Sequence, residues 1–513
     1  MRASTPILVA AATLLACASP PPAIQPLPAT TVRTLTTAAY WPTAGWRASA
    51  PEAQGLSSAA LARALEVVQE RALPIHSLLL IRHGVVVLDA SFYPFPAGSR
   101  HDVAAVTMSI TSALVGVALQ MGAIADITQP AFALLPSRPS TMDKRKDAIR
   151  IEDLLGMQSG LDCGFKNDDP ELRQMMRSAN WVQTAVDLPM RSNPGGEFGY
   201  CSANYHLLSA ILTKGTRLSA EAFGKANLFG PLGIRDVYWP ADPQGVTRGW
   251  GDLQLTPRDL AKIGYLFLHG GQWEDKQLIS RAWVERSTAP RVVYDKFNIY
   301  GYGWWTHFDV PPGLYEAIGR GGQRLTIWPE KDVILVLTGG GFEPGELIPF
   351  LRASLSSDQP LPPDPQAHAH LLELANAGAV AGPSTPSPLP SQAAIVSGRE
   401  YLMKSNSMGL QSISLSFPGG NEARAKIVLA DRELDLPIGL DGIYRLAASS
   451  PDGIAAGARG EWKAGRTFAL DVNLIGKINR YLLTMDFDKD SVHVEIIEAT
   501  GVLRGETSGT AAR

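Results

Sequence analysis

Two hydrophobic periods divide the first two thirds of the chain into helices and strands. Residues 75–82 and 85–89 are rich in apolar side chains on either side of His83–Gly84, which predicts two strands joined by a tight turn. Residues 108–121 are apolar on nearly every face, which predicts a buried helix. Further helices are expected at 56–69, 151–157, 204–212 and 256–268, and further strands at 325–328 and 333–337. The pattern predicts an α/β body, residues 51–356, whose antiparallel sheet joins early and late strands around a large helical insertion.

The pattern changes in the last third of the chain. Residues 357–392 are dense in Pro, Ala and Ser, which is typical of a linker, with one helix expected at 368–376. Strand-like segments separated by Gly and Asp turns then follow at 412–417, 425–429, 467–472, 481–487 and 491–496. Residues 393–513 are therefore predicted to form an antiparallel all-β domain, either a sandwich or an open barrel, with a structural or interaction role.

The first residues of the chain have the pattern of an export signal. Arg2 precedes an apolar run at 7–16 that is too short to span a bilayer. Residues 14–17 resemble a bacterial lipobox, in which Cys17 would carry lipid; the alternative is a cleaved signal peptide, 1–17, with a chance cysteine. Residues 18–50 are then expected to be a tether. The predicted location is the bacterial cell envelope, as a periplasmic protein or a membrane-anchored lipoprotein.

Composition and charge narrow the classes of partner. The 513 residues are 45% hydrophobic and 19% charged, which suits two or three globular domains. A net charge of -3 without any basic block argues against nucleic acid as a partner. The nine histidines are scattered and no H-E-x-x-H or paired C-x-x-C occurs, so neither a metal nor another cofactor is expected.

The cysteines suggest one disulfide. If Cys17 carries lipid, Cys163 and Cys201 remain as an even pair. An exported protein meets an oxidising compartment, so we expect these two residues to be bonded. The alternative is two buried free thiols.

Residues 102–116 carry the most informative motif. They read Asp-Val-Ala-Ala-Val-Thr-Met-Ser-Ile-Thr-Ser-Ala-Leu-Val-Gly. The segment resembles the nucleophile helix of the serine β-lactamase, penicillin-binding protein and class C-type esterase superfamily, where D-x-x-S-V-T-K is usual. The family's catalytic Ser and Lys fall on Ala105 and Met108. Alanine has no hydroxyl to attack a carbonyl, and methionine cannot accept its proton.

Two later segments complete the resemblance, which covers roughly residues 55–355. In residues 199–208, Tyr200 matches the family's general base and Ser202 takes the third position of its Y-x-N or Y-S-x motif. Residues 319–323 resemble the relaxed G-x-G-G-Q version of the K-T-G motif. These imply a substrate-binding wall formed by Arg320, Gly321, Gly322 and Gln323.

The resemblance also implies particular roles within that wall. The Gln323 backbone N–H is expected to be one oxyanion donor. Arg320 is expected to pair with a substrate carboxylate, or alternatively to be a surface arginine. The implied fold is an α/β, or α+β, serine β-lactamase and DD-peptidase-like body.

Two functions from different classes are compatible with this combination. The first is a pseudoenzyme that binds a small molecule, a peptidoglycan-like fragment or another protein, with a lipid anchor at the membrane. The alternative is an active esterase, amidase or β-lactamase-like hydrolase with a rewired site built on Tyr200, Arg320 and backbone donors. An assembly role for the β domain is compatible with the first.

Overall fold

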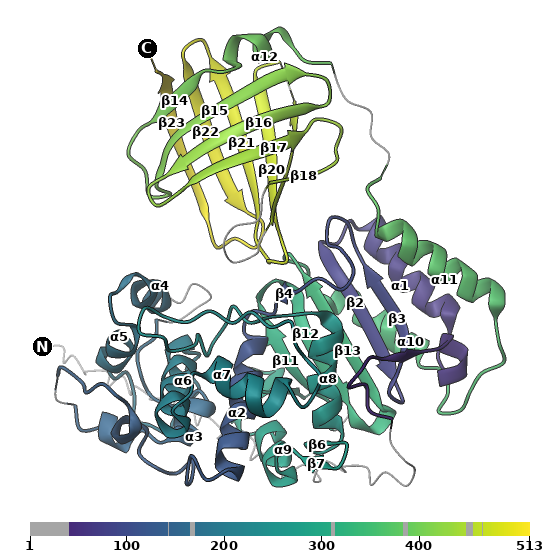
Figure 1. The fold of residues 1–513 in the computed structure, drawn as a ribbon, viewed down its shortest axis with the longest axis vertical. Helices are drawn as coiled ribbons and strands as arrows, with labels where there is room; N and C mark the ends of the chain where they lie inside the picture. Colours follow the sequence, from purple (N-terminus) through teal and green to yellow (C-terminus); the bar gives the residue numbers. More distant parts are fainter. Residues whose placement is uncertain are drawn as a thin grey trace, which may run out of the picture.

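The computed structural model describes residues 40–141, 143–164, 170–308, 313–382, 388–447, 455–463 and 465–512. The expected export signal, with Cys17, lies outside the described residues. Figure 1 shows an α/β body with a separate β domain at one end of its sheet. None of the helices in the described ranges has the length and apolar character needed to cross a membrane.

A mixed sheet forms the centre of the body. Its strand order is β1-β3-β2-β13-β12-β11-β10-β9-β8, and every pairing is antiparallel except that of β1 with β3. The early strand β2 pairs with the late strand β13, with Leu79 opposite Val336, as the sequence predicted. The strands are β1 (Arg47–Ala48), β2 (Ile75–Arg82), β3 (Val85–Ser91), β8 (Val292–Val293), β9 (Asn298–Tyr300), β10 (Trp305–His307), β11 (Tyr315–Gly319), β12 (Gln323–Trp328) and β13 (Val333–Gly339).

Alternating side chains of this sheet supply two separate cores. Leu79 and Val336 belong to the core shared with α2 (Val106–Gln120) and α8 (Pro257–Leu268). Leu78 and Leu335 point to the opposite face, where they meet α1 (Ser58–Glu70) and α10 (Ile348–Ser354). This division follows from the two-residue repeat of a strand.

The helical insertion surrounds α2. Residues from Val106 to Ala118 are all buried, so the predicted all-round burial of this helix is confirmed. Helix α6 packs against α2, and α3 and α5 pack against α6. The remaining helices of this part are α3 (Ile151–Leu155), α4 (Pro170–Arg177), α5 (Trp181–Asp187), α6 (Ser202–Thr216), α7 (Ala220–Gly224) and α9 (Arg281–Thr288). Short pairs are formed by β4 (His101–Asp102) with β5 (Gln254–Leu255) and by β6 (Gln272–Trp273) with β7 (Lys276–Gln277).

The body extends beyond the boundary expected from composition. Helix α11 (Pro365–Gly378) lies inside the segment 357–392 that was expected to be a linker. It packs along α1, as Figure 1 shows, and its Leu371 is only 1% exposed. The helix expected at 368–376 is therefore present, and what the composition did not show is that it packs on the body.

The β domain is a barrel. Nine strands, β14–β17 and β19–β23, pair in a ring, and the contact of Gly439 on β17 with Arg459 on β19 closes it within the described residues. The predicted all-β domain is confirmed, but it is a closed barrel and neither the sandwich nor the open barrel that the sequence suggested. Its elements are α12 (Ser391–Val396), β14 (Glu400–Met403), β15 (Leu410–Gly419), β16 (Glu422–Leu429), β17 (Glu433–Gly439), β18 (Arg445–Leu446), β19 (Ala455–Trp462), β20 (Thr467–Ile475), β21 (Arg480–Asp488), β22 (Ser491–Glu498) and β23 (Arg504–Ala511).

The tight packing of α2 can be tested at Gly116. A Cβ at this position would lie 2.1 Å from Cδ1 of Trp283, a buried ring whose Nε1 donates to the Ser112 carbonyl. Helix propensity favours alanine by about 1 kcal/mol, whereas overpacking costs about 1–3 kcal/mol. We expect Gly116→Ala to lower the free energy of unfolding in urea by up to about 2 kcal/mol, the net of these two effects. Gly345→Ala, whose added Cβ meets nothing within 4 Å, should change it by less than about 0.5 kcal/mol.

Candidate functional site

The N-terminus of α2 presents residue 105 at the position of the family nucleophile. Ala105 is the N-cap of α2 and makes no side-chain capping bond. The preceding residue, Ala104, has a φ of 48°, which is uncommon for a residue other than glycine. Its N–H donates to Asp102 Oδ1 at 2.9 Å, so the first residue of the motif fixes the turn into the helix. The backbone of the motif is thus in place, with a methyl group where a hydroxyl would be needed.

The second motif meets the first through Tyr200 and Met108. The Tyr200 hydroxyl lies 3.6 Å from the Met108 sulfur and donates to it. Met108 is 2% exposed and lies beneath the tyrosine, whereas Tyr200 is 38% exposed. A thioether is only a weak acceptor and cannot take a proton from an attacking group. The contact places Met108 where the family's lysine would stand beside its tyrosine.

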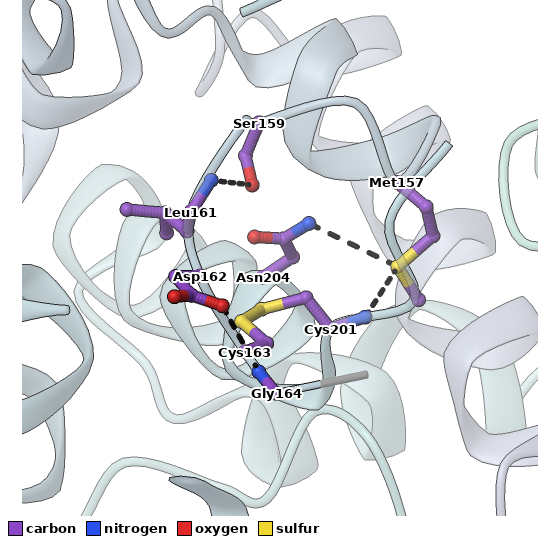
Figure 2. The surroundings of a disulfide bond; sticks show 8 residues. All are labelled: Met157, Ser159, Leu161, Asp162, Cys163, Gly164, Cys201 and Asn204. Atoms are coloured by element: carbon purple, nitrogen blue, oxygen red, sulfur yellow. Dashed lines mark hydrogen bonds between the residues drawn. A yellow bond between two sulfur atoms is a disulfide. The ribbon is translucent and has the colours of Figure 1, made fainter. Parts of the chain in front are cut away.

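A disulfide holds the segment that carries Tyr200. Cys163 and Cys201 are bonded, which confirms the expected pair; they are 38 residues apart in sequence. Cys201 is the N-cap of α6, and the buried Ser202 is the first residue of that helix. Figure 2 shows the Met157 sulfur accepting from the Cys201 N–H, at 3.4 Å, and from the Asn204 side chain. The cross-link anchors one side of Tyr200, so the tyrosine is fixed over Met108.

The third motif lies against the start of α2. A Cβ added to Gly319 would come within 2.6 Å of the Val103 carbonyl oxygen and 3.0 Å of the Ala104 Cβ. Only glycine allows β11 to approach the helix this closely. The Gln323 side chain bonds both the N–H and the carbonyl of Gly339, at 3.1 and 2.6 Å, and so ties β12 to β13. The side-chain amide of Gln323 therefore supports the turn between β11 and β12.

Gly321 and Gly322 form the tip of this turn with φ of 82° and 94°. Together with Arg320, Phe342 and Thr500 they line a cavity of about 370 Å³. Thr500 belongs to the barrel, which means that the cavity wall includes both domains. The glycine turn of the third motif is thus bordered by the barrel on one side, while Gly319 lies against the start of α2.

Arg320 faces the barrel. Its guanidinium donates to the Thr500 hydroxyl and lies 3.7 Å from the carboxylate of Glu498, a buried residue at the end of β22. Of the two readings of Arg320, pairing with a substrate carboxylate and a surface arginine, neither anticipated these partners. The guanidinium already has an anionic neighbour within the protein.

Sequence reasoning missed a buried ion cluster beside the first motif. Lys477 Nζ, from the β20–β21 turn of the barrel, lies 3.0 Å from Asp102 Oδ2 and 3.4 Å from Asp252 Oδ1. Burial raises the pKa of Asp102, with a further contribution from the Asp252 charge and opposition from Lys477. Burial lowers the pKa of Lys477, but the two carboxylates outweigh it, so the net direction is upward. No local pattern signals this cluster, since Lys477 and Asp102 are 375 positions apart.

A buried histidine pair adjoins the same aspartate. His101 Nδ1 donates to the Asp102 carbonyl at 2.8 Å, so its Nε2 accepts from His76 Nδ1 at 2.7 Å. Burial lowers the pKa of His101 to about 4, and burial together with His101 lowers that of His76 well below its ordinary value. Both rings are therefore neutral near pH 7. In the part of the chain that the structure describes, no group of three His, Cys, Asp or Glu residues is placed to hold a metal ion.

Comparison with known families gives the class of protein. The family model described as Beta-lactamase matches residues 22–348, more than half of the chain, so the chain belongs to the β-lactamase family. This match confirms the serine β-lactamase superfamily that the three motifs suggested.

Particular relatives can also be named. The 6-aminohexanoate-dimer hydrolase of Paenarthrobacter ureafaciens is 27% identical over 283 residues, which are 51% of this chain and 71% of the relative. The penicillin-binding protein of Bacillus halodurans has a TM-score of 0.48 and 16% identity over 56% of this chain and 99% of its own. The D-stereospecific amidohydrolase of Streptomyces sp. has a TM-score of 0.47 and 15% identity over 57% of this chain and 97% of its own.

Removing the disulfide should destabilise the body. Opening a loop with a sequence separation of 38 restores chain entropy to the unfolded state, worth roughly 4 kcal/mol. We expect Cys163→Ser with Cys201→Ser to lower the free energy of unfolding by about this amount in denaturant titrations. Reductant should destabilise the native protein similarly and leave the double variant unchanged. Equal sensitivity of both proteins to reductant would contradict the assignment.

The histidine pair should make the protein sensitive to mild acid. Unfolded histidines bind protons near pH 6.5, but His101 in the folded state does so only near pH 4. The unfolded state therefore binds more protons within this window, and stability falls as the pH falls from 6.5 to 4. For His101 alone the loss is roughly 3 kcal/mol. Urea unfolding at pH 7 and pH 4 should show a smaller difference for His101→Gln, and parallel pH profiles would refute the assignment.

Proposed function

We propose that this member of the β-lactamase family binds its ligand without forming an acyl-enzyme. The supporting observation is the contact between the Tyr200 hydroxyl and the Met108 sulfur, directly below Ala105 at the start of α2. The position that should hold the proton acceptor holds a thioether, and the position that should hold the nucleophile holds a methyl group. In a comparable serine enzyme, loss of the nucleophile alone lowers kcat by roughly a millionfold.

The chemical class of ligand follows from the family and the named relative. Family chemistry is acyl transfer, and the Paenarthrobacter relative is named as a hydrolase of 6-aminohexanoate dimer. We therefore propose a small molecule that contains an amide or ester, with peptidoglycan-like fragments included. The Glu498 carboxylate beside Arg320 disfavours a ligand whose recognition depends on that arginine alone.

The proposed setting is the bacterial cell envelope. Arg2, the apolar run at 7–16 and Cys17 support export with a lipid anchor. A tether of the composition seen in 18–37 would let the body and barrel reach ligands near a membrane surface. The barrel is proposed to contribute to protein interactions as well.

Residual hydrolysis is the second candidate, and the exposure of Tyr200 favours it. Tyr200 is 38% exposed, so its hydroxyl could polarise an activated ester that reaches it. Binding and backbone donors without a nucleophile leave roughly a thousandfold acceleration over water. Slow turnover of activated esters, without any covalent intermediate, would be its signature.

Covalent probes test the proposal. The wild-type protein should not be labelled by a fluorescent penicillin or a fluorophosphonate, because residue 105 has no hydroxyl. The variant Ala105→Ser with Met108→Lys restores both groups over an otherwise retained backbone, so we expect it to be labelled. The matched control Ala105→Gly with Met108→Lys has the lysine but no nucleophile, and should remain unlabelled.

Each arm of this experiment can contradict the proposal. Stoichiometric labelling of the wild type, with the site identified by mass spectrometry, would end the pseudoenzyme interpretation. An unlabelled but folded Ala105→Ser and Met108→Lys protein would show that the cleft has lost more than two chemical groups. Labelling of the glycine control would place the nucleophile elsewhere.

A further inference from the structure

The turn between β20 and β21 of the barrel is seated on the first motif of the body. The Gly476 carbonyl accepts from the Asp102 N–H at 2.8 Å. The next residue, Lys477, is 13% exposed and places its ammonium between Asp102 and Asp252. Ile478 then covers Gly321, whose added Cβ would lie 2.5 Å from its Cγ2. One short turn thus contacts both the first and the third motif.

Lys477 contacts two aspartates. One of them has a positive φ, and the other accepts a hydrogen bond from a residue that has a positive φ. Asp252 itself has a φ of 62°, and Ala104, with a φ of 48°, donates its N–H to Asp102. Residues other than glycine persist in this region only where surrounding contacts enforce it. The Asp102 carboxylate spans the gap: Oδ1 accepts from Ala104, and Oδ2 accepts from Lys477 at 3.0 Å. A single carboxylate therefore links the barrel ammonium to the residue that precedes 105.

The charge balance makes this link depend on Lys477. Asp102 and Asp252 are both held by its ammonium, and Arg248 supplies a second cation, at 2.7 Å, to Asp252 alone. Without Lys477, Asp102 would be a buried carboxylate with a like charge nearby and no cation in contact. Removal of one partner from such a buried cluster is costly, because the remaining charge stays uncompensated.

We propose that Lys477 is a positioning residue: through Asp102 it holds the strained Ala104 and so sets where residue 105 is presented in the cleft. The barrel then contributes a positioning residue to the site. This inference is independent of the proposed function, because the same backbone places residue 105 whether it is alanine or a restored serine.

A purely adhesive role for Lys477 makes a different prediction. The two domains also meet at a second contact, where the Tyr444 N–H on the barrel donates to the Tyr93 hydroxyl on the body at 2.8 Å. If Lys477 merely joined the domains, its loss would raise amide exchange both at the start of α2 and at Tyr444. If it positions Ala104, its loss should loosen the start of α2 and leave the Tyr444 amide protected.

Hydrogen exchange of the full chain separates these roles. In Lys477→Met we expect amide exchange across residues 103–108 to rise about tenfold, with exchange at Tyr444 unchanged. Lys477→Arg keeps a cation beside Asp102 and should restore most of the protection. Lys463→Met is the matched control, because this lysine lies on the same barrel, is 57% exposed and pairs with Glu461, so exchange at 103–108 should match the wild type.

Two further variants keep the test decisive. If Lys477→Met does not fold, Asp102→Asn removes the same charge link from the body side and should give the same local rise. Adding Ala104→Gly to Lys477→Met relieves the backbone strain and should recover part of the protection. Unchanged exchange at 103–108 in both Lys477→Met and Asp102→Asn, or an equal rise at Tyr444, would overturn the proposal.

Discussion

The burial of α2 from Val106 to Ala118 is the constraint on which the site depends. This helix packs against the sheet on one side and against α6 on another, with Gly116 allowing direct contact with the Trp283 ring. An apolar helix enclosed in this way has no freedom to rotate, because protein interiors are close-packed. The position of residue 108 relative to Tyr200 is therefore set by packing and does not require the catalytic groups themselves.

This packing explains how the backbone of the first motif keeps its place with alanine at position 105 and methionine at position 108. A lysine at position 108 would need buried partners for its charge, whereas Met108 fits the apolar floor without them. The Tyr200 segment is held separately, by the disulfide at Cys201 and by the start of α6. The segments that carry residues 105 and 200 therefore have separate structural supports, so their placement does not depend on the reactive groups.

The barrel changes how the site is understood. Its β20–β21 turn brings Lys477 to Asp102, and its β22–β23 loop brings Thr500 to Arg320. The cleft is consequently a product of both domains, although the motifs all lie in the body. Buried charges from a second domain near a first motif are expensive to maintain, which argues that their placement has a use.

The sequence by itself determined five main helices and four central strands of the body, the order of the three motifs and the missing hydroxyl at Ala105, because periodicity and residue identity are local properties. It also suggested the Cys163–Cys201 bond, because two cysteines remain if Cys17 carries lipid and because an exported protein meets an oxidising compartment. It did not reveal α11 as part of the body, the closure of the barrel or the partners of Arg320. Only the tertiary structure decided that Lys477 lies between Asp102 and Asp252, because contacts between residues hundreds of positions apart arise from folding and leave no periodic pattern in the chain.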